Sequence, residues 1–212
     1  MNRLKNGKQD ALLVLVRHGQ SEVNTKGIFS SGREGYPLTD VGREQAGAIA
    51  QELKKLNVSK VYSSPVLRAV ETATIISTNL GLSFEQDERL AERGFGSLEG
   101  KTYSGYSWRM NKEDYGIEEF GILSARMNSF MNDLGNGVIV AVTHGDTMRA
   151  PALRILGLDE TSGFGLRAYN ANIAVIQIKN GWHALIAFGM PVVSDDLLRK
   201  IPERFLAVGP SS

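Results

Sequence analysis

Two apolar runs that each lead into a histidine and a glycine constrain this chain most. Residues 12–16 (LLVLV) lead into Arg17-His18-Gly19, and residues 138–142 (VIVAV) lead into Thr143-His144-Gly145. Such runs, bounded by turn residues, are typical of strands buried on both faces, which occur in sheets covered by helices on both sides. In these sheets ligand sites lie at the carboxyl ends of the strands. We therefore expect both histidine turns to belong to one site.

The rest of the chain alternates between helix and strand patterns. Apolar residues at helical spacing predict helices over residues 40–56, 66–80, 116–134 and 147–156. Short β-type runs predict further strands over residues 60–62, 83–85, 173–178 and 182–188. Thr39 is the expected cap of the first helix, and an Asn-Gly turn at residues 179–181 pairs the last two strands as a hairpin. The alternation predicts an α/β fold, a three-layer α/β/α sandwich whose sheet is mostly parallel with an antiparallel hairpin at one edge.

The domain organisation follows from the same pattern. Residues 1–212 are expected to form a single domain, with residues 1–10 as a flexible tail. Residues 19–35 and 90–100 are rich in glycine and are predicted to be loops, the former with one short helical turn. The polar and aromatic segment 101–121 is predicted to be a short cover over the site.

Composition excludes several classes of function. The 24 Lys and Arg residues nearly balance the 23 Asp and Glu residues, so no bulk field favours nucleic acid or an anionic membrane. The absence of cysteine excludes a disulfide framework, a thiolate nucleophile and a Cys-based zinc site. The apolar run that begins at Ala11 stops at Arg17, too short for a signal peptide or a membrane span. We expect a soluble cytoplasmic protein, a monomer or homodimer, that binds neither nucleic acid nor membrane.

The residues at the strand ends describe an anion pocket with a nucleophile. The predicted turns bring Arg17 and His18 together with Ser64, Arg68, Glu92 and His144. Arginine presents a planar fork that matches phosphate oxygens, and glycine after each histidine lets a ligand approach the backbone. A neutral imidazole can attack phosphorus when its other nitrogen is held protonated by a hydrogen bond. A nearby carboxylic acid can protonate the departing alkoxide and then activate water, and Glu92 is the candidate for both steps.

Five motifs extend this picture along most of the chain. They are Arg17-His18-Gly19 with Asn24; Pro37-Leu38-Thr39 with Gly42 and Gln45-Ala46; Ser63-Ser64-Pro65 with Arg68-Ala69 and Glu71-Thr72-Ala73; Glu92 with Gly96, Glu99 and Gly100; and His144-Gly145 with Arg149. In this order they resemble the motifs of the histidine phosphatase superfamily, also called the phosphoglycerate mutase-like family.

The resemblance implies a role for each site residue. His18 would be the phosphorylated nucleophile, Glu92 the proton donor and His144 the second catalytic histidine. Arg17, Arg68 and His144 would bind the phosphoryl oxygens, with Asn24 and the backbone at Gly145 assisting. Ser30, in a Phe-Ser pair that resembles the family's Phe-Thr pair, and Arg93, directly after Glu92, would contact the substrate. Such a pocket acts by positioning and electrostatic stabilisation and needs no metal.

Some of these residues also fit other roles. His183, inside the predicted hairpin, is expected to be structural. The carboxylates at Glu85, Asp87, Glu88 and Glu99 are near Glu92 in sequence, and Glu92 is preferred on its motif match. Two histidines and a carboxylate also resemble a metal-binding triad, but an arginine beside His18 would repel a cation. A non-catalytic phospho-ligand binding module would lack the nucleophile or the acid, and this chain has both.

The final choice lies between hydrolysis and transfer. Phosphoglycerate mutases of this type carry Glu-Arg-x-Tyr, whereas residues 92–95 here end in Phe95, and their long insertion with paired arginines is reduced to segment 101–121 with Arg109 alone. A short cover leaves the intermediate open to water, which a mutase must exclude. We therefore predict a metal-independent phosphomonoesterase acting on a small phosphorylated metabolite, without a cofactor. The alternative is a 2,3-bisphosphoglycerate-dependent phosphoglycerate mutase, which would need 2,3-bisphosphoglycerate as its primer.

Overall fold

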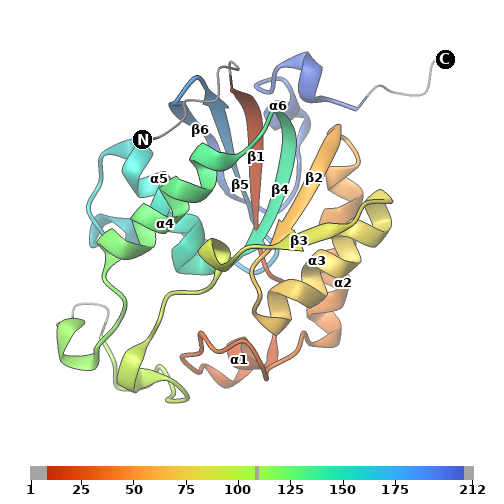
Figure 1. The fold of residues 1–212 in the computed structure, drawn as a ribbon. Helices are drawn as coiled ribbons and strands as arrows, with labels where there is room; N and C mark the ends of the chain where they lie inside the picture. Colours follow the sequence, from red (N-terminus) through yellow and green to blue (C-terminus); the bar gives the residue numbers. More distant parts are fainter. Residues whose placement is uncertain (1–8, 108–109, 208–212) are drawn as a thin grey trace.

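A mixed sheet of six strands forms the centre of the computed structural model, which describes residues 9–107 and 110–207 (Figure 1). The spatial order is β3-β2-β4-β1-β5-β6. The strands are β1 (Asp10–Arg17), β2 (Val58–Ser63), β3 (Phe84–Gln86), β4 (Gly137–Thr143), β5 (Ile173–Lys179) and β6 (Trp182–Met190). The first four strands pair in parallel, while β5 pairs antiparallel with both β1 and β6. The predicted α/β fold with an antiparallel edge hairpin is confirmed.

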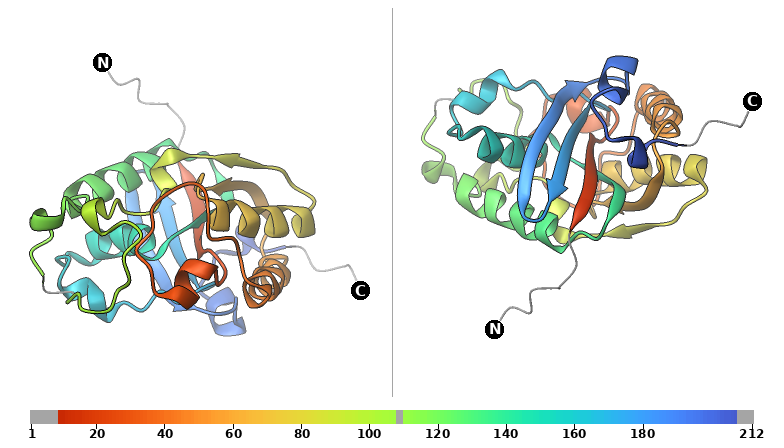
Figure 2. Two further views of the ribbon diagram at one scale, coloured as in Figure 1. Left: turned by 90° about the horizontal axis from the view of Figure 1, so that it is seen from below. Right: turned by 90° about the horizontal axis from the view of Figure 1, so that it is seen from above.

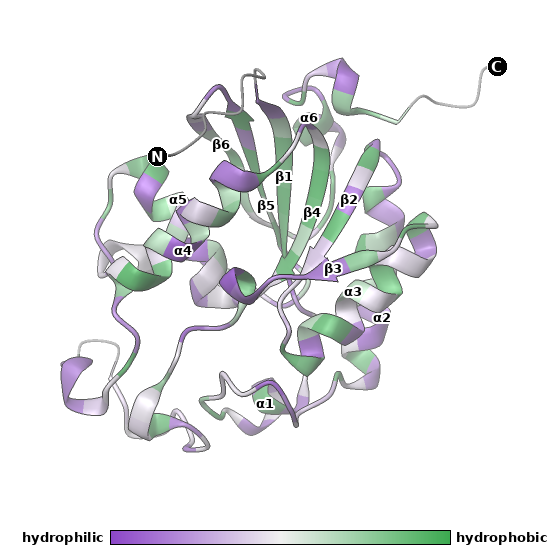
Figure 3. Cartoon of the chain, in the orientation of Figure 1, coloured by the Kyte–Doolittle hydropathy of each residue, from purple (hydrophilic) through white to green (hydrophobic). Residues whose placement is uncertain are grey.

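Helices cover the sheet on both faces (Figure 2). They are α1 (Glu22–Lys26), α2 (Asp40–Leu53), α3 (Leu67–Leu80), α4 (Phe120–Asp133), α5 (Gly145–Leu156) and α6 (Asp195–Leu198). Strand β1 shows why two layers are needed, because its residues from Ala11 to Val16 are all fully buried. Leu12, Val14 and Val16 pack into the core beneath α2 and α3, and Leu13 and Leu15 into the core beneath α4. The central strands are accordingly hydrophobic along their length (Figure 3).

Local signals explain where the helices begin and end. The Thr39 hydroxyl accepts a hydrogen bond from the Gly42 N–H, so it caps α2 as predicted. Helix α2 ends at Leu53, three residues before the predicted end, and Leu56 instead forms an isolated bridge with Leu206. Helix α4 starts at Phe120 rather than at residue 116, because Gly116 adopts a left-handed conformation with φ 63° after a short 3-10 turn.

The first strand starts earlier in the chain than the sequence predicted. Strand β1 starts at Asp10, and the Gln9 amide donates to the carbonyls of Met131 and Leu134, so the predicted tail over residues 1–10 is wrong at its last two positions. Residues 1–8 and Arg109 lie outside the described residues. Within the described ranges, none of the helices has the length and apolar character that crossing a membrane requires.

Candidate active site

Strands β1 and β4 bring the two histidine turns together at their carboxyl ends. The strands are parallel neighbours in which Arg17 is paired with Thr143, so His18 and His144 follow at the same level of the sheet. The His18 N–H donates to the Thr143 carbonyl over 2.9 Å. The two imidazole rings lie with their centroids 5.1 Å apart. The two histidine turns thus lie side by side at the carboxyl end of the sheet.

The turn after β1 is held by residues that the sequence analysis did not assign to the site. The Gly19 N–H donates to the Thr72 hydroxyl over 3.1 Å, and the Asn170 amide donates to the His18 carbonyl over 3.1 Å. Gly42 of α2 lies against the same turn: a Cβ on Gly42 would fall 1.9 Å from the Gln20 carbonyl oxygen. Glycine is required here because the helix and the turn touch through their backbones.

This contact predicts opposite effects for two alanine substitutions in α2. Gly42→Ala is expected to destabilise the protein by about 1–3 kcal/mol, because backbone has to move to admit the methyl group. Gly47→Ala is the matched control: its Cβ would meet nothing within 4 Å. It is expected to stabilise the protein by about 0.5–1 kcal/mol, because alanine favours the helix. Chemical denaturation of both variants measures the difference, and equal midpoints would contradict the close contact.

His18 is arranged as a neutral nucleophile. Its Nδ1 lies 2.7 Å from the Gly19 carbonyl oxygen, which can only accept, so Nδ1 carries the proton and Nε2 the lone pair. The Arg68 Nε donates to that Nε2 over 3.1 Å. Burial, and then the charges of Arg68 and Arg17, hold the pKa of His18 well below its usual value. The imidazole is therefore unprotonated on the nitrogen that faces the site.

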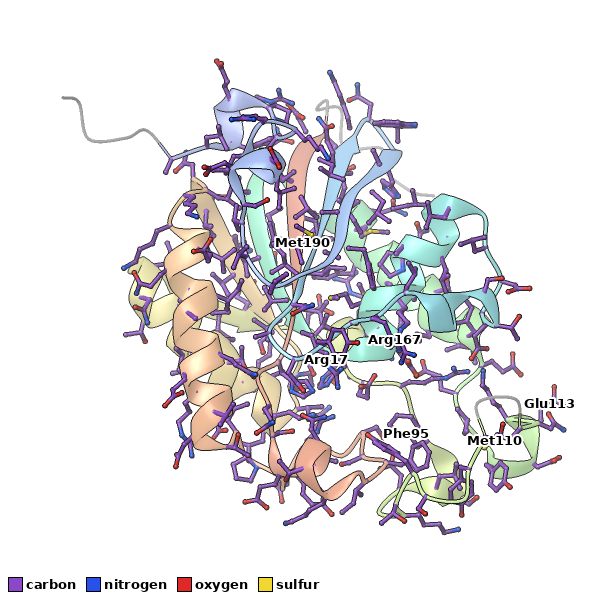
Figure 4. The ribbon with its side chains drawn as sticks, turned by 180° about the vertical axis from the view of Figure 1, so that it is seen from behind. Arg17, Phe95, Met110, Glu113, Arg167 and Met190 are labelled. Atoms are coloured by element: carbon purple, nitrogen blue, oxygen red, sulfur yellow. The ribbon has the colours of Figure 1, made fainter. Side chains whose placement is uncertain are left out.

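Two buried arginines supply the positive charge. Arg68 is 2% exposed and donates from Nη2 to the Ser30 carbonyl over 2.9 Å. Arg17 donates from Nη1 to the Ala168 carbonyl, and it lies at the carboxyl end of β1, above Phe95 in the view of Figure 4. The Nε of Arg17 and the Nη1 of Arg68 are buried without a hydrogen-bond partner among the described residues. Buried N–H groups of this kind are costly unless an acceptor is bound, so the site is built for an anion.

His144 lies between Arg68 and Glu92. Its Nε2 is 2.8 Å from the Ser64 hydroxyl, and its Nδ1 is 3.3 Å from Arg68 Nη2 and 3.8 Å from Glu92 Oε2. Burial, and then the charge of Arg68, hold its pKa well below the usual value, so His144 is neutral in the absence of an anion.

Glu92 has the protonation properties of a general acid near neutral pH. Burial, and then the nearby carboxylate of Asp146, raise its pKa to about 7, against the opposing effect of Arg68. The Arg93 N–H donates to its Oε1 over 2.9 Å and fixes the carboxyl group. The other carboxylates considered are engaged elsewhere, since Glu85 pairs with Lys60, Asp87 with Arg89, Glu88 with Arg33, and Glu99 with Ser31.

The remaining predicted residues lie at the border of the site. Asn24 Oδ1 accepts hydrogen bonds from the Ser21 N–H and the Asn170 amide, so its oxygen holds the loop in place. Ser30 contacts the site through its carbonyl oxygen, on Arg68. Gly145 is the first residue of α5 and lies beside Arg17. Arg93 is buried, and its Nη1 donates to Glu160 over 2.6 Å.

Cation binding has no support in this arrangement. No group of three or more histidine, aspartate or glutamate side chains within residues 9–107 and 110–207 is placed to hold a metal ion. The His18 and His144 rings face Arg68 instead, and a guanidinium disfavours a second cation at the same position.

The chain resembles known proteins over most of its length. The model of the histidine phosphatase superfamily (branch 1) matches residues 13–190. A 2,3-bisphosphoglycerate-dependent phosphoglycerate mutase of Thermoplasma acidophilum is 34% identical over 178 residues, which cover 80% of this chain and 88% of the relative. Phosphoserine phosphatase 1 of Hydrogenobacter thermophilus is 29% identical over 183 residues, which cover 79% of this chain and 86% of the relative.

Solved structures show the same fold. A phosphoglycerate mutase of Bacillus anthracis superposes with a TM-score of 0.74 at 21% identity, covering 91% of this chain and 97% of that one. A phosphoserine phosphatase of Entamoeba histolytica, solved in complex with 3-phosphoglyceric acid, superposes with a TM-score of 0.71 at 26% identity, covering 88% of this chain and 99% of that one.

Proposed function

Because this chain belongs to the histidine phosphatase superfamily, we propose that it is a metal-independent phosphomonoesterase that hydrolyses a small phosphorylated metabolite through a phosphohistidine intermediate. The observation that carries the proposal is the neutral His18 Nε2 together with the N–H groups of Arg17 and Arg68 that have no partner among the described residues. A nucleophile and an oxyanion site in one buried pocket are what phosphoryl transfer requires.

In the first step His18 Nε2 attacks phosphorus and the bond from phosphorus to the ester oxygen breaks. Glu92, protonated through its raised pKa, gives its proton to the departing alkoxide and becomes a carboxylate. Arg17 and Arg68 stabilise the charge on the phosphoryl oxygens. Entry of a phosphate dianion also opposes the arginines' effect on the pKa of His144, which favours the protonated form of that imidazole.

In the second step water attacks the phosphohistidine. The Glu92 carboxylate takes a proton from that water while the bond from phosphorus to His18 breaks, so the products are inorganic phosphate and the starting enzyme. The Gly19 carbonyl keeps the His18 proton on Nδ1 throughout, which returns Nε2 with its lone pair. Glu92 therefore gives one proton in the first step and regains one in the second, and it is a carboxylate between the two.

A phosphoglycerate mutase is the second candidate, favoured by the identity to the relative from Thermoplasma acidophilum. In that case the phosphohistidine would pass its phosphoryl group back to a hydroxyl of a sugar acid, with 2,3-bisphosphoglycerate as the primer. The absence of a tyrosine hydroxyl at Phe95 supports the phosphatase instead.

An assay of product partition separates the two candidates. The purified protein is given 3-phosphoglycerate with 2,3-bisphosphoglycerate, and 2-phosphoglycerate and inorganic phosphate are followed together. A panel of phosphate monoesters is assayed in parallel, with and without a chelator. We expect phosphate release from several esters, unchanged by chelation, and little isomerisation. Rapid isomerisation with negligible hydrolysis would overturn the proposed phosphatase, and activity restored only by a divalent metal would overturn its metal independence.

A further inference from the structure

A pocket beside the phosphoryl site is placed to hold the leaving group. It borders the site through sequence neighbours of three site residues: Phe29 precedes Ser30, Arg93 follows Glu92, and Asp146 follows Gly145. Its empty volume, including space open to solvent, is about 520 Å³. The alcohol of an ester bound at His18 would therefore lie next to this space.

The pocket wall is largely apolar. Its apolar members come from the loop after α1, the glycine loop, the cover segment 101–121 and helices α4 and α5: Phe29, Phe95, Met110, Ile117, Phe120 and Leu153. The rings of Phe29 and Phe95 pack with centroids 5.2 Å apart, and Phe29 and Ile117 belong to a small core of their own. Figure 4 shows Phe95 and Met110 on the segments that face Arg17. A wall of this kind gains free energy by removing apolar surface of a ligand from water.

Two cations of the wall, Arg93 and Lys112, share one carboxylate of the protein, that of Glu160. Arg93 donates from Nη1 to Glu160 over 2.6 Å and from Nε to the Glu118 carbonyl over 2.6 Å. Lys112 contacts the same Glu160 carboxylate. Arg93 is 4% exposed, so this pair is largely desolvated.

Arg149 is satisfied in the same way on the other side of the pocket. It donates from Nη1 to Asp146 over 2.6 Å and from Nε to the Leu166 carbonyl over 2.9 Å. The three cationic side chains of the described wall are thus bonded to two carboxylates of the protein, Glu160 and Asp146. A carboxylate on a substrate would have to approach Glu160 or Asp146, and like charges at close range in a partly desolvated site repel strongly.

We propose that this pocket selects phosphate esters of uncharged apolar alcohols, aromatic ones included, and that Glu160 is the residue that rejects acidic leaving groups. The inference rests on the proposed phosphatase function and specifies its substrate class. Glu160 occupies the position on Arg93 and Lys112 where the carboxylate of an acidic substrate would otherwise bind.

A matched pair of esters tests the selection. Benzyl phosphate and 4-carboxybenzyl phosphate differ by one carboxylate. For the wild-type protein, kcat/KM is expected to favour benzyl phosphate by about tenfold or more. In Glu160→Gln the ratio is expected to fall to within about threefold, because Arg93 and Lys112 then accept the substrate carboxylate. Glu85→Gln is the control. It makes the same charge change on β3, in the exposed ion pair between Glu85 and Lys60, and it is expected to keep the wild-type ratio.

A binding measurement tests the selectivity of the pocket independently of hydrolysis. The affinities of benzylphosphonate and 4-carboxybenzylphosphonate for the wild-type protein are compared by calorimetry, and benzylphosphonate is expected to bind more tightly. Absence of hydrolysis of every ester would refute the phosphatase, while the phosphonates still report on the pocket. Equal or tighter binding of the carboxylated phosphonate, a higher kcat/KM for 3-phosphoglycerate or phosphoserine than for benzyl phosphate, or an unchanged ratio in Glu160→Gln would overturn the inference.

Discussion

Replacing His18 with alanine is expected to abolish phosphoenzyme formation and to lower kcat/KM by at least about 10⁴-fold, close to 5.4 kcal/mol in the barrier. The loss is large because the substitution removes the only atom that the proposed mechanism allows to bond to phosphorus. The remaining arginines can still bind and polarise the ester, so weak residual turnover is compatible with the mechanism. The hydrogen bonds that join His18 to Thr143 and Asn170 run through its backbone and stay in the variant, whereas the ring's bonds to Gly19 and Arg68 are lost.

The measurement is transfer of labelled phosphate to the protein, quenched without acid because phosphohistidine is acid-labile, together with steady-state turnover. His183→Ala is the matched control. His183 lies on β6 and its Nε2 makes no hydrogen bond within the described part of the chain, so this variant is expected to label and turn over normally. Turnover of the His18 variant within about tenfold of the wild-type rate, near 1.4 kcal/mol, would refute a covalent role for His18.

The sequence predicted the fold and the centre of the site because both rest on local patterns. The buried runs before His18 and His144 have compositions that few structures other than inner strands accommodate, and parallel strands place their ends at one edge. The chemistry of a carboxylate alone did not identify Glu92 as the acid, since four other carboxylates lie near it in sequence. Its motif was needed as well. The structure distinguishes them by partners: the others are paired or exposed, and Glu92 alone among them reaches His144.

The supports of the site were not predictable, because they depend on backbone contacts between distant segments. Asn170 reaches the His18 carbonyl because Ala171 adopts a left-handed conformation with φ 56°, which alanine rarely does. The polar residues directly before the predicted strand at residue 173 were the one available signal. Arg93 was predicted from its motif to contact the substrate, but the motif carries no information about Glu160, which reaches it from beyond α5.

Glu92→Gln is expected to slow hydrolysis of alkyl phosphates by about 10²–10⁴-fold, the usual range for losing a general acid. Glutamine keeps the acceptor for the Arg93 N–H and the shape of the side chain, so the loss reports on the proton. Aryl phosphates leave as weaker bases and need less protonation, so their first step should be slowed far less. Rapid-quench measurement of that step for benzyl and 4-nitrophenyl phosphate compares the two, and equal slowing would identify another residue as the acid.

The pH dependence of kcat/KM tests the same proton in the unmodified protein. Glu92 has a pKa of about 7 and donates only when protonated, so kcat/KM for an alkyl phosphate should fall above pH 7 as the acid is lost. Below about pH 6 the ester loses its dianionic form, which gives the profile a second, acidic limb. In Glu92→Gln the alkaline limb should disappear while the acidic limb stays, because only the first belongs to the enzyme. An alkaline limb that persists in the variant would show that a different group titrates there. Glu92 would then act only through its charge and not as the general acid.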